Sequence, residues 1–408
     1  MSDFEEKTRG NATRAVAAGR QARWTSLPEQ PGGIVNPPVW RASTHLYDDM
    51  ADHLAGRPNE DGHFYYGRRG GPTQWALADA LTQLEPGAHS TELFPSGVAA
   101  IAAALMAVLR PGDELLFSDN AYEPTRAIAF GLLKQMGVTA RAFDPLDVAG
   151  FADLIGSTTR AVMLESPGSL TMEVCDVPAL ADIARTCGLT VLIDNTWATG
   201  TGFAALEQGC DITITSLTKH VGGHSDIMMG SVSAGAAHIR RVRRQAQLTG
   251  QVVSPDDAAL ALRGLRTMPM RLERCAATAL EVATFLSHRP EVSAVLCPLL
   301  PGAPGHDLWA RDFAGGCGLF SFVLADGYEA KHRSCLIDAL DLFGIGYSWG
   351  GFESLAIPFD PASIHTLRPW PPGIDSGSGL GIRLSIGLED ASDLVTDLAQ
   401  ALERMTQC

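Results

Sequence analysis

Hydrophobic positions along the chain recur with two different periods, and the two alternate from about residue 71 onwards. Short strand-like runs, several of which end in polar residues, occur in STELFPSG, DELLFSDNAYEP, GVTARAFDP, AVMLESPGS, TVLIDNTWATG and DITITSLTK. Between them lie segments with helical spacing, such as TQWALADALTQLE (73–85), VAAIAAALMAVL (98–109) and VPALADIARTC (177–187). Strands that alternate with helices predict an α/β fold, in which helices cover both faces of a mostly parallel sheet.

The two flanks of this alternating region have different patterns. Residues 1–70 show little periodicity, and LPEQPGGIVNPPVW is too rich in Pro and Gly for a long helix. This part is expected to be an extended arm that packs on a second subunit. After about residue 266 come a long amphipathic helix and the strand-like runs CGLFSFVLA and GIRLSIGLE. The pattern therefore predicts an arm (1–70), a large domain (71–266) and a smaller α+β domain (267–408).

Polar side chains follow several of the predicted strands at the point where each strand ends. They form the clusters Ser118-Asp119-Asn120, Glu165-Ser166, Asp194-Asn195-Thr196 and Ser216 to Lys219. In open parallel sheets, ligands bind beyond the carboxyl ends of the strands. The clusters are therefore candidate site residues by position alone.

Composition and charge narrow the functional classes. A formal net charge of −15 argues against nucleic acid or an anionic membrane as the main partner. The N-terminal residues lack the apolar core of a signal peptide, and no apolar run reaches the length of a membrane span. The cysteines have no CxxC spacing, which favours reduced thiols over disulfides or a zinc site. They are Cys175, Cys187, Cys210, Cys275, Cys297, Cys317, Cys335 and Cys408. We expect a soluble, cytoplasmic protein without a bound metal.

Lys219 is one of only four lysines in a chain rich in arginine. Arginine stays charged in proteins, whereas a buried lysine can lose its proton and become a nucleophile. The alternative is an ordinary lysine at the solvated end of a strand. A cofactor such as pyridoxal 5′-phosphate (PLP) needs such an amine, an anion beside its ring nitrogen, a phosphate site and a flat side chain against its ring.

The same strand ends offer all of these parts. Asp194 could face the ring nitrogen, and Tyr122 could stack on the ring. Gly97 and Val98 begin a helix, where free N–H groups suit a phosphate, and Ser216 and Thr218 could add hydroxyl groups. Each residue also has an ordinary structural role, as a turn residue, a half-buried tyrosine or a helix cap. Only their combination favours a cofactor site.

Other signals were weaker. The chain has no P-loop, no GxGxxG fingerprint and no HExxH motif. His220, His224 and Asp226 are close in sequence, but without further ligands they are expected to shape the turn after Lys219. Arg383 lies among apolar residues and needs an anionic partner, which could be a structural or a substrate carboxylate.

Several motifs resemble a known family. ESPGSLTMEV, IDNTWATG, TKHVGGHSD and YSWGGFESL are similar to those of the Cys/Met-metabolism (transsulfuration) PLP-dependent enzymes, and to the bacterial cystathionine β-lyases in particular. YGRRG, NAYEP, GHDLWARDFAG and RLSIGLED match in the same order, from about residue 60 to the C-terminus. The resemblance implies the type I, aminotransferase-like fold of PLP enzymes and a homotetramer built from dimers with shared active sites.

The resemblance also implies roles for individual residues. It makes Lys219 the covalent attachment point and the catalytic base, Asp194 the partner of the ring nitrogen, and Tyr122 the ring-stacking, catalytic tyrosine. Gly97, Val98, Ser216 and Thr218 match the phosphate-binding positions, and Tyr66 and Arg68 match the pair that reaches the phosphate of a neighbouring subunit. The substrate-binding positions are Arg383, which matches the arginine for the α-carboxylate, with Tyr347, Ser348, Trp349 and Arg69.

The implied reaction is α,β-elimination of L-cystathionine to homocysteine, pyruvate and ammonia, within methionine biosynthesis. Trp349 and the form ESPGS are typical of β-lyases rather than γ-acting enzymes. Ala127 departs from the pattern, because relatives have an aspartate there that lies near the far end of cystathionine. The alternatives are a β-lyase for another cysteine S-conjugate or cystine, a γ-lyase, and a non-catalytic regulatory protein on the same fold.

Overall fold

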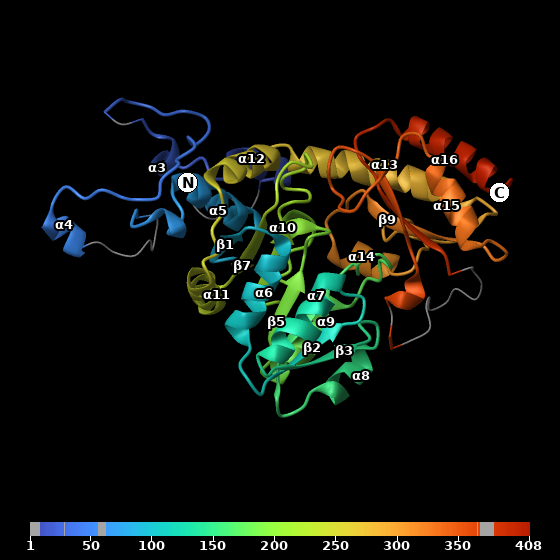
Figure 1. The fold of residues 1–408 in the computed structure, drawn as a ribbon, viewed down its shortest axis with the longest axis horizontal. Helices are drawn as coiled ribbons and strands as arrows, with labels where there is room; N and C mark the ends of the chain where they lie inside the picture. The colour runs from blue at the N-terminus through green and yellow to red at the C-terminus, as the bar shows by residue number, and fades with distance from the viewer. Residues whose placement is uncertain (1–8, 28, 56–62, 365, 368–378) are drawn as a thin grey trace. The chain divides into compact units, whose positions relative to one another are not determined.

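A computed structural model describes residues 9–27, 29–55, 63–364, 366–367 and 379–408 (Figure 1). The chain forms two compact units, and each is assembled from two separate stretches. Unit 1 comprises Met1–Val108 with Asp211–Pro269, and unit 2 comprises Leu109–Cys210 with Met270–Cys408. These units describe internal packing, so the domain boundaries expected from the sequence stay a prediction.

Unit 1 contains three strands in the order β1-β7-β6, with β7 antiparallel to both neighbours. The strands are β1 (Ser90–Phe94), β6 (Ile212–Ser216) and β7 (Gly230–Ala234). The helices are α2 (Asn11–Ala17), α3 (Ala22–Thr25), α4 (Met50–Ala55), η1 (Gly67–Arg69), α5 (Pro72–Leu84), α6 (Gly97–Val108), α11 (Ala236–Thr249) and α12 (Pro255–Leu265). The helices predicted over 73–85 and 98–109 are confirmed. The short helices α2, α3 and α4 lie in the arm, where the sequence showed no period.

The first stretch of unit 2 contains four strands in the order β5-β4-β2-β3, all parallel. They are β2 (Glu114–Ser118), β3 (Thr139–Phe143), β4 (Thr159–Glu165) and β5 (Thr190–Asp194). The helices are α7 (Glu123–Ala127), the π-helix η2 (Ile128–Leu133), α8 (Val148–Phe151), η3 (Ala152–Leu154), α9 (Val177–Thr186) and α10 (Thr199–Gly202). The carboxyl ends of parallel strands share one edge, so the clusters after β2, β4 and β5 meet there.

The second stretch of unit 2 forms a five-stranded sheet in the order β10-β11-β12-β9-β8. Its strands are β8 (Val292–Leu296), β9 (Leu319–Leu324), β10 (Gly344–Ile345), β11 (Leu355–Phe359) and β12 (Gly381–Ser385). Its helices are α13 (Met268–Ser287), α14 (His306–Asp312), α15 (Ala330–Asp338), η4 (Pro361–Ser363) and α16 (Ala391–Met405). The two strand-like runs of the sequence correspond to β9 and β12. One buried apolar cluster joins both stretches of unit 2, from Leu116 and Val162 to Phe320 and Leu398.

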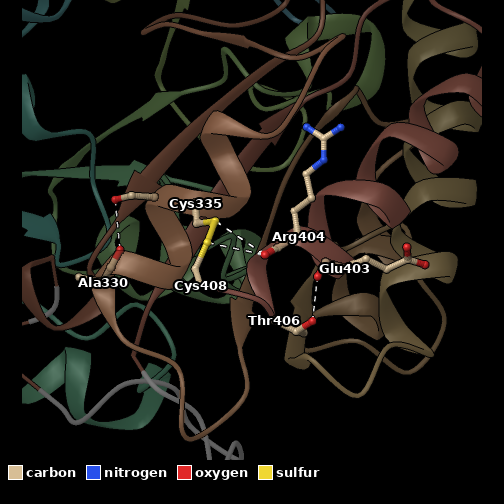
Figure 2. The surroundings of a disulfide bond; sticks show 7 residues. Ala330, Cys335, Glu403, Arg404, Thr406 and Cys408 are labelled. Carbon is tan, nitrogen blue, oxygen red and sulfur yellow. Dashed lines mark hydrogen bonds between the residues drawn. A yellow bond between two sulfur atoms is a disulfide. The ribbon is translucent and has the colours of Figure 1, made fainter.

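The expectation of eight reduced thiols is wrong for one pair. Cys335 of α15 and Cys408 form a disulfide across a sequence separation of 73 residues, while the other six cysteines are free. The pairing arises because α15 packs against α16, which brings the chain end to α15 (Figures 1 and 2). Figure 2 shows both sulfur atoms facing the backbone oxygen of Arg404, at 3.8 and 3.7 Å. Sequence spacing gave no signal for this contact.

The described residues form neither a membrane-spanning helix nor a metal-binding cluster. None of the helices formed by these residues is long and apolar enough to cross a membrane. Within the same ranges, no three His, Cys, Asp or Glu side chains are grouped so that they could hold a metal ion.

Candidate active site

Lys219 lies on a tight turn directly after β6 in unit 1. Its N–H donates to Ser216 O at 3.1 Å, and Gly223 N–H donates to Lys219 O at 2.8 Å. Thr218 closes the turn: its N–H donates to Met229 O at 3.1 Å, and its hydroxyl oxygen accepts from Met229 N–H at 2.9 Å. These bonds hold the backbone of the turn, so the half-buried Lys219 is anchored at the carboxyl end of β6.

The start of α6, also in unit 1, forms an anion cradle with Ser216. Ser96 uses its side-chain and backbone oxygens to accept from Ala99 N–H and Ala100 N–H, both at 3.1 Å. The N–H groups of Gly97 and Val98 have no hydrogen-bond partner among the described residues. They point along the helix axis, where the helix dipole favours an anion such as phosphate.

Two glycines keep this cradle open. A Cβ atom on Gly97 would lie 2.9 Å from the Ser216 side chain, and one on Gly230 would lie 2.4 Å from Ser96 O. Both distances are too short for real contacts, so only glycine allows the three segments to approach this closely. The predicted phosphate-binding residues Gly97, Val98, Ser216 and Thr218 therefore come from adjoining segments of one unit.

In unit 2, Asp194 and Glu165 end the neighbouring strands β5 and β4 and are paired in register. Asp194 Oδ1 accepts from Thr196 N–H at 3.0 Å and from the Thr196 hydroxyl group. Hydrogen bonds of this kind stabilise the charged form of a carboxylate. Asp194 thus meets the requirement for an anion beside a protonated ring nitrogen.

Tyr122 precedes α7 in unit 2 and is tied to the same strand ends. Its N–H donates to Glu165 Oε2 at 2.7 Å. Partial burial raises the pKa of the Tyr122 phenol, and the negative charges of Asp194 and Glu123 raise it further, against the effect of Arg383. The phenol is therefore neutral at physiological pH, which suits a ring-stacking or proton-donating role.

Arg383 is a buried cation in the middle of β12. The residue is 6% exposed, and its Nη2 donates to Ser348 O at 2.7 Å. Within the described ranges its Nε atom has no hydrogen-bond partner and no carboxylate pairs with it. Burial lowers its pKa to about 10, so it remains charged at neutral pH. A buried cation of this kind requires an anion, and a guanidinium group binds a carboxylate with two parallel hydrogen bonds.

The segment beside Arg383 is strained, as functional segments often are. Ser348 has a φ of +80°, an uncommon value for a residue with a side chain. Its neighbours differ: Trp349 packs on the buried cluster of unit 2, whereas Tyr347 is 89% exposed. The motif Tyr347-Ser348-Trp349 therefore supplies a backbone anchor for Arg383 as well as side chains.

Tyr66, Arg68 and Arg69 lie in another part of unit 1. Arg68 Nη1 donates to Gln247 O of α11 at 3.1 Å, and the Arg69 guanidinium lies 5.3 Å from the Tyr65 ring centre. Both arginines line a cavity of about 280 Å³ whose remaining walls include α5, β1 and α11. Neither Lys219 nor Gly97 lines this cavity. Their predicted contact with a neighbouring subunit stays a prediction.

Glu165 is the site residue that sequence reasoning underrated. Its position at a strand end marked it as a candidate, but no pattern in the sequence predicts that it binds the backbone of Tyr122. His224 behaves as expected, since its Nδ1 lies 2.7 Å from Gly222 O and helps to shape the turn after Lys219.

The observed groups fit PLP by their chemistry. Unit 1 offers an amine on a fixed turn and a cradle of free N–H groups that a Cβ atom would fill. Unit 2 offers a stabilised carboxylate, a neutral phenol and a buried guanidinium group. These are the groups that a phosphorylated aldehyde with a basic ring nitrogen and an amino-acid substrate would need.

Comparisons with known proteins agree with this set. The model of the Cys/Met metabolism PLP-dependent enzyme family matches residues 13–403. Cystathionine beta-lyase MetC of Escherichia coli (strain K12) is 41% identical over 396 residues, covering 96% of this chain and 98% of its own. Cystathionine beta-lyase of Haemophilus influenzae is 39% identical over 397 residues, covering 97% and 98%.

A crystal structure gives the same result for the fold. The structure of metB from Corynebacterium glutamicum superposes with a TM-score of 0.85 at 29% identity, covering 98% of this chain and 99% of that one. The α/β fold is therefore the type I fold of PLP enzymes, as the sequence predicted. Since the family model spans nearly the whole sequence, the chain belongs to the Cys/Met-metabolism family of PLP-dependent enzymes and uses pyridoxal 5′-phosphate as its cofactor.

Proposed function

We propose that this protein is a carbon–sulfur β-lyase that converts L-cystathionine and water into homocysteine, pyruvate and ammonia. The choice of cystathionine rests on the two cystathionine β-lyases that are similar over nearly their whole length. The observation that carries the binding of an amino acid is the buried guanidinium group of Arg383, which has no carboxylate partner among the described residues.

Each predicted site residue would have a distinct role toward the cofactor. Lys219 would hold PLP through its amine, Gly97, Val98, Ser216 and Thr218 would hold the phosphate, and Asp194 would keep the ring nitrogen protonated. When bound, PLP supplies an electron sink for the charge that develops at the substrate Cα. Arg383 would grip the α-carboxylate and so orient the Cα–H bond for cleavage.

Proton movements fall to Lys219. In the presence of substrate, the Nζ atom of Lys219 would accept the proton of the substrate Cα. The Cβ–S bond then breaks, and its electron pair leaves with the sulfur atom as homocysteine thiolate, which takes up a proton. The remaining 2-aminoacrylate is hydrolysed by water to pyruvate and ammonia, which balances the reaction.

Replacing Lys219 tests this assignment. Lys219→Ala should lower kcat for cystathionine by about a thousandfold or more, because the attachment point and the base are lost together. Lys134→Ala, at an exposed position after η2, is the matched control and should keep normal activity. Borohydride treatment followed by peptide mapping should place the reduced cofactor on the peptide that contains Lys219.

The products decide between the proposal and its rivals. Pyruvate together with homocysteine supports the cystathionine β-lyase. A better rate on cystine or S-alkyl cysteines would indicate another β-lyase, and 2-oxobutyrate would indicate a γ-lyase. Absence of any keto acid from PLP-loaded protein would leave only a non-catalytic role.

We further propose a cytoplasmic homotetramer built from dimers that share their active sites. Helix α4 has no buried residue, and Leu46, Met50 and Leu54 of this segment are 85%, 66% and 79% exposed. Such apolar side chains favour coverage by a second copy.

The six free cysteines suit a reducing compartment. A monomeric mass from light scattering would contradict the proposed tetramer. Fractionation that finds the protein outside the cytoplasm would contradict the proposed location.

A further inference from the structure

Two carboxyl groups lie side by side at the edge of the parallel strands of unit 2. Glu165 is the last residue of β4, Asp194 is the last residue of β5, and the two are register partners. Neighbouring strands are about 4.8 Å apart, and the side chains of paired residues point to the same face. Charging both groups would therefore cost repulsion at short range, as in other carboxyl pairs that share a site.

Hydrogen bonds indicate which of the two carries the charge. Asp194 Oδ1 accepts two hydrogen bonds from Thr196, through the N–H and the hydroxyl group. Glu165 Oε2 accepts from Tyr122 N–H at 2.7 Å. Hydrogen-bond donors stabilise a carboxylate. Asp194 accepts more such bonds than Glu165, so Asp194 keeps the negative charge and Glu165 retains the proton. Burial raises the pKa of Glu165 well above its usual range, and the charge of Asp194 raises it further, against the Tyr122 bond.

The groups that face Glu165 from neighbouring elements do not reverse this balance. They are the carboxylate of Asp194, the phenol of Tyr122 and the thiol of Cys175, whose Sγ lies 3.6 Å from Glu165 O. Burial raises the pKa of Cys175 to about 12, so this thiol is neutral. The charge of Arg383 lowers the pKa of the Tyr122 phenol, whereas the groups that shift the pKa of Glu165 are Asp194 and the Tyr122 N–H. No cation among the described residues therefore favours a charged Glu165.

We propose that Glu165 is a positioning residue that works as a neutral acid: it fixes the backbone of Tyr122 and leaves Asp194 as the single negative charge at the ends of β4 and β5. The roles of Tyr122 and Asp194 toward PLP rest on the proposed function, whereas the neutral state of Glu165 does not. A charged Glu165 would weaken Asp194 as an anion, because each charge disfavours the other. A missing Glu165 would release the turn that holds Tyr122.

Two variants distinguish the effect of a charge on Glu165 from the effect of its hydrogen bond to the backbone of Tyr122. Glu165→Gln keeps an oxygen acceptor and the shape without a charge, and Glu165→Ala removes the contact. Glu123→Gln is the control, because Glu123 also acts on the Tyr122 phenol but does not bond to the backbone of Tyr122. Glu165→Gln should keep the PLP dissociation constant and the pH profile of kcat/KM within about threefold of wild type, whereas Glu165→Ala should weaken PLP binding by about tenfold.

The PLP-free protein gives a readout that does not involve activity. A folded-state pKa above the unfolded one means that the unfolded chain loses the Glu165 proton first, so wild-type stability falls as the pH rises from about 5 to 8. The urea midpoint of wild type should therefore drop relative to that of Glu165→Gln over this range at one protein concentration. Glu123→Gln should run parallel to wild type.

Three outcomes would overturn the inference. Parallel midpoints of wild type and Glu165→Gln would show an ordinary, ionised Glu165. Equal losses of PLP affinity in Glu165→Gln and Glu165→Ala would show that the charge is needed. Normal PLP binding in Glu165→Ala would show that Glu165 positions nothing. Failure of cystathionine turnover in wild type would instead count against the proposed function, and the midpoint test would still stand.

Discussion

At the residue scale, the arginines of unit 2 differ in whether the protein supplies a carboxylate partner for them, and this difference distinguishes structural from functional side chains. Arg126 and Arg333 each have a carboxylate partner, Asp119 and Asp360, and both pairs are satisfied within the protein. Arg383 is buried, unlike the other two, and among the described residues its hydrogen bonds go to the backbone oxygens of Gly346 and Ser348. Burying a cation without an anion is costly, so a protein tolerates it where a ligand completes the pair. This contrast makes Arg383 the most informative single residue of the site.

Ala127 bears on how the far end of the substrate, with its distal ammonium group, is bound. It ends α7 and is exposed, and Asp119, the ion-pair partner of the adjacent Arg126, is already engaged by several donors. Asp119 Oδ1 accepts from Arg126 Nη1 at 2.9 Å, and its Oδ2 accepts from Thr366 N–H and Leu367 N–H at 2.7 and 3.2 Å. The oxygens of Asp119 are therefore already engaged, so this residue is a poor substitute for the aspartate that the family resemblance leads us to expect at position 127.

Ala127→Asp should consequently raise kcat/KM for cystathionine. A charge-assisted hydrogen bond to the distal ammonium group contributes about 1.5–3 kcal/mol, or roughly tenfold to a hundredfold in specificity. A neutral S-alkyl cysteine should gain little, and Ala127→Asn should act as the uncharged control. If wild type already prefers cystathionine strongly and the Asp variant leaves the substrate ratio unchanged, position 127 does not set specificity.

At the element scale, the strands carry most of what the sequence could predict. Alternating periods located β2, β4, β5 and β6, and the rule for parallel strands placed their polar ends at candidate sites. Periodicity could not reveal the π-helix η2, because its 6 residues make little more than one turn, which is too short to distinguish its period from that of an α-helix. The hydrogen bond between Tyr122 and Glu165 was also hidden, since it joins side chain to backbone across 43 residues.

The N-terminal elements support a prediction about assembly. Arg68 of η1 bonds to α11, and the exposed side chains of the α4 segment offer an uncovered apolar surface. If Arg68 serves the phosphate of a neighbouring chain, Arg68→Ala should weaken PLP retention. Mixing inactive Arg68→Ala and inactive Lys219→Ala chains should then restore about a quarter of wild-type activity after random exchange within dimers.

The complementation needs two controls. First, mass spectrometry must show that the subunits exchange. Second, Arg240→Ala, at an exposed position of α11, should bind PLP normally, and when mixed with Lys219→Ala it should restore no more activity than wild-type chains do. Confirmed exchange without returning activity would mean that each chain completes its own site.

At the scale of the whole molecule, both units are built from stretches far apart in the sequence, and such packing is where sequence reasoning fails. Apolar patterns show that α15 and α16 each have a buried face, but not that the two lie together. The same gap explains the missed disulfide: 73 residues separate Cys335 from Cys408, and only the packing of α15 on α16 joins them. A cross-link at this place has a measurable consequence.

Removing the cross-link should lower stability without lowering activity. A disulfide across this separation restricts the unfolded chain and contributes about 2–4 kcal/mol, and neither α15 nor the chain end carries a residue of the candidate site. Cys408→Ser should therefore lower the thermal midpoint under oxidising conditions, with kcat/KM unchanged. Cys187→Ser, which removes an exposed free thiol, should leave the midpoint as it is. With dithiothreitol, wild type should fall to the midpoint of Cys408→Ser, because a reducing compartment opens the pair. If wild type melts at the same temperature with and without dithiothreitol, the bond does not stabilise the fold, and the protein works with eight reduced thiols.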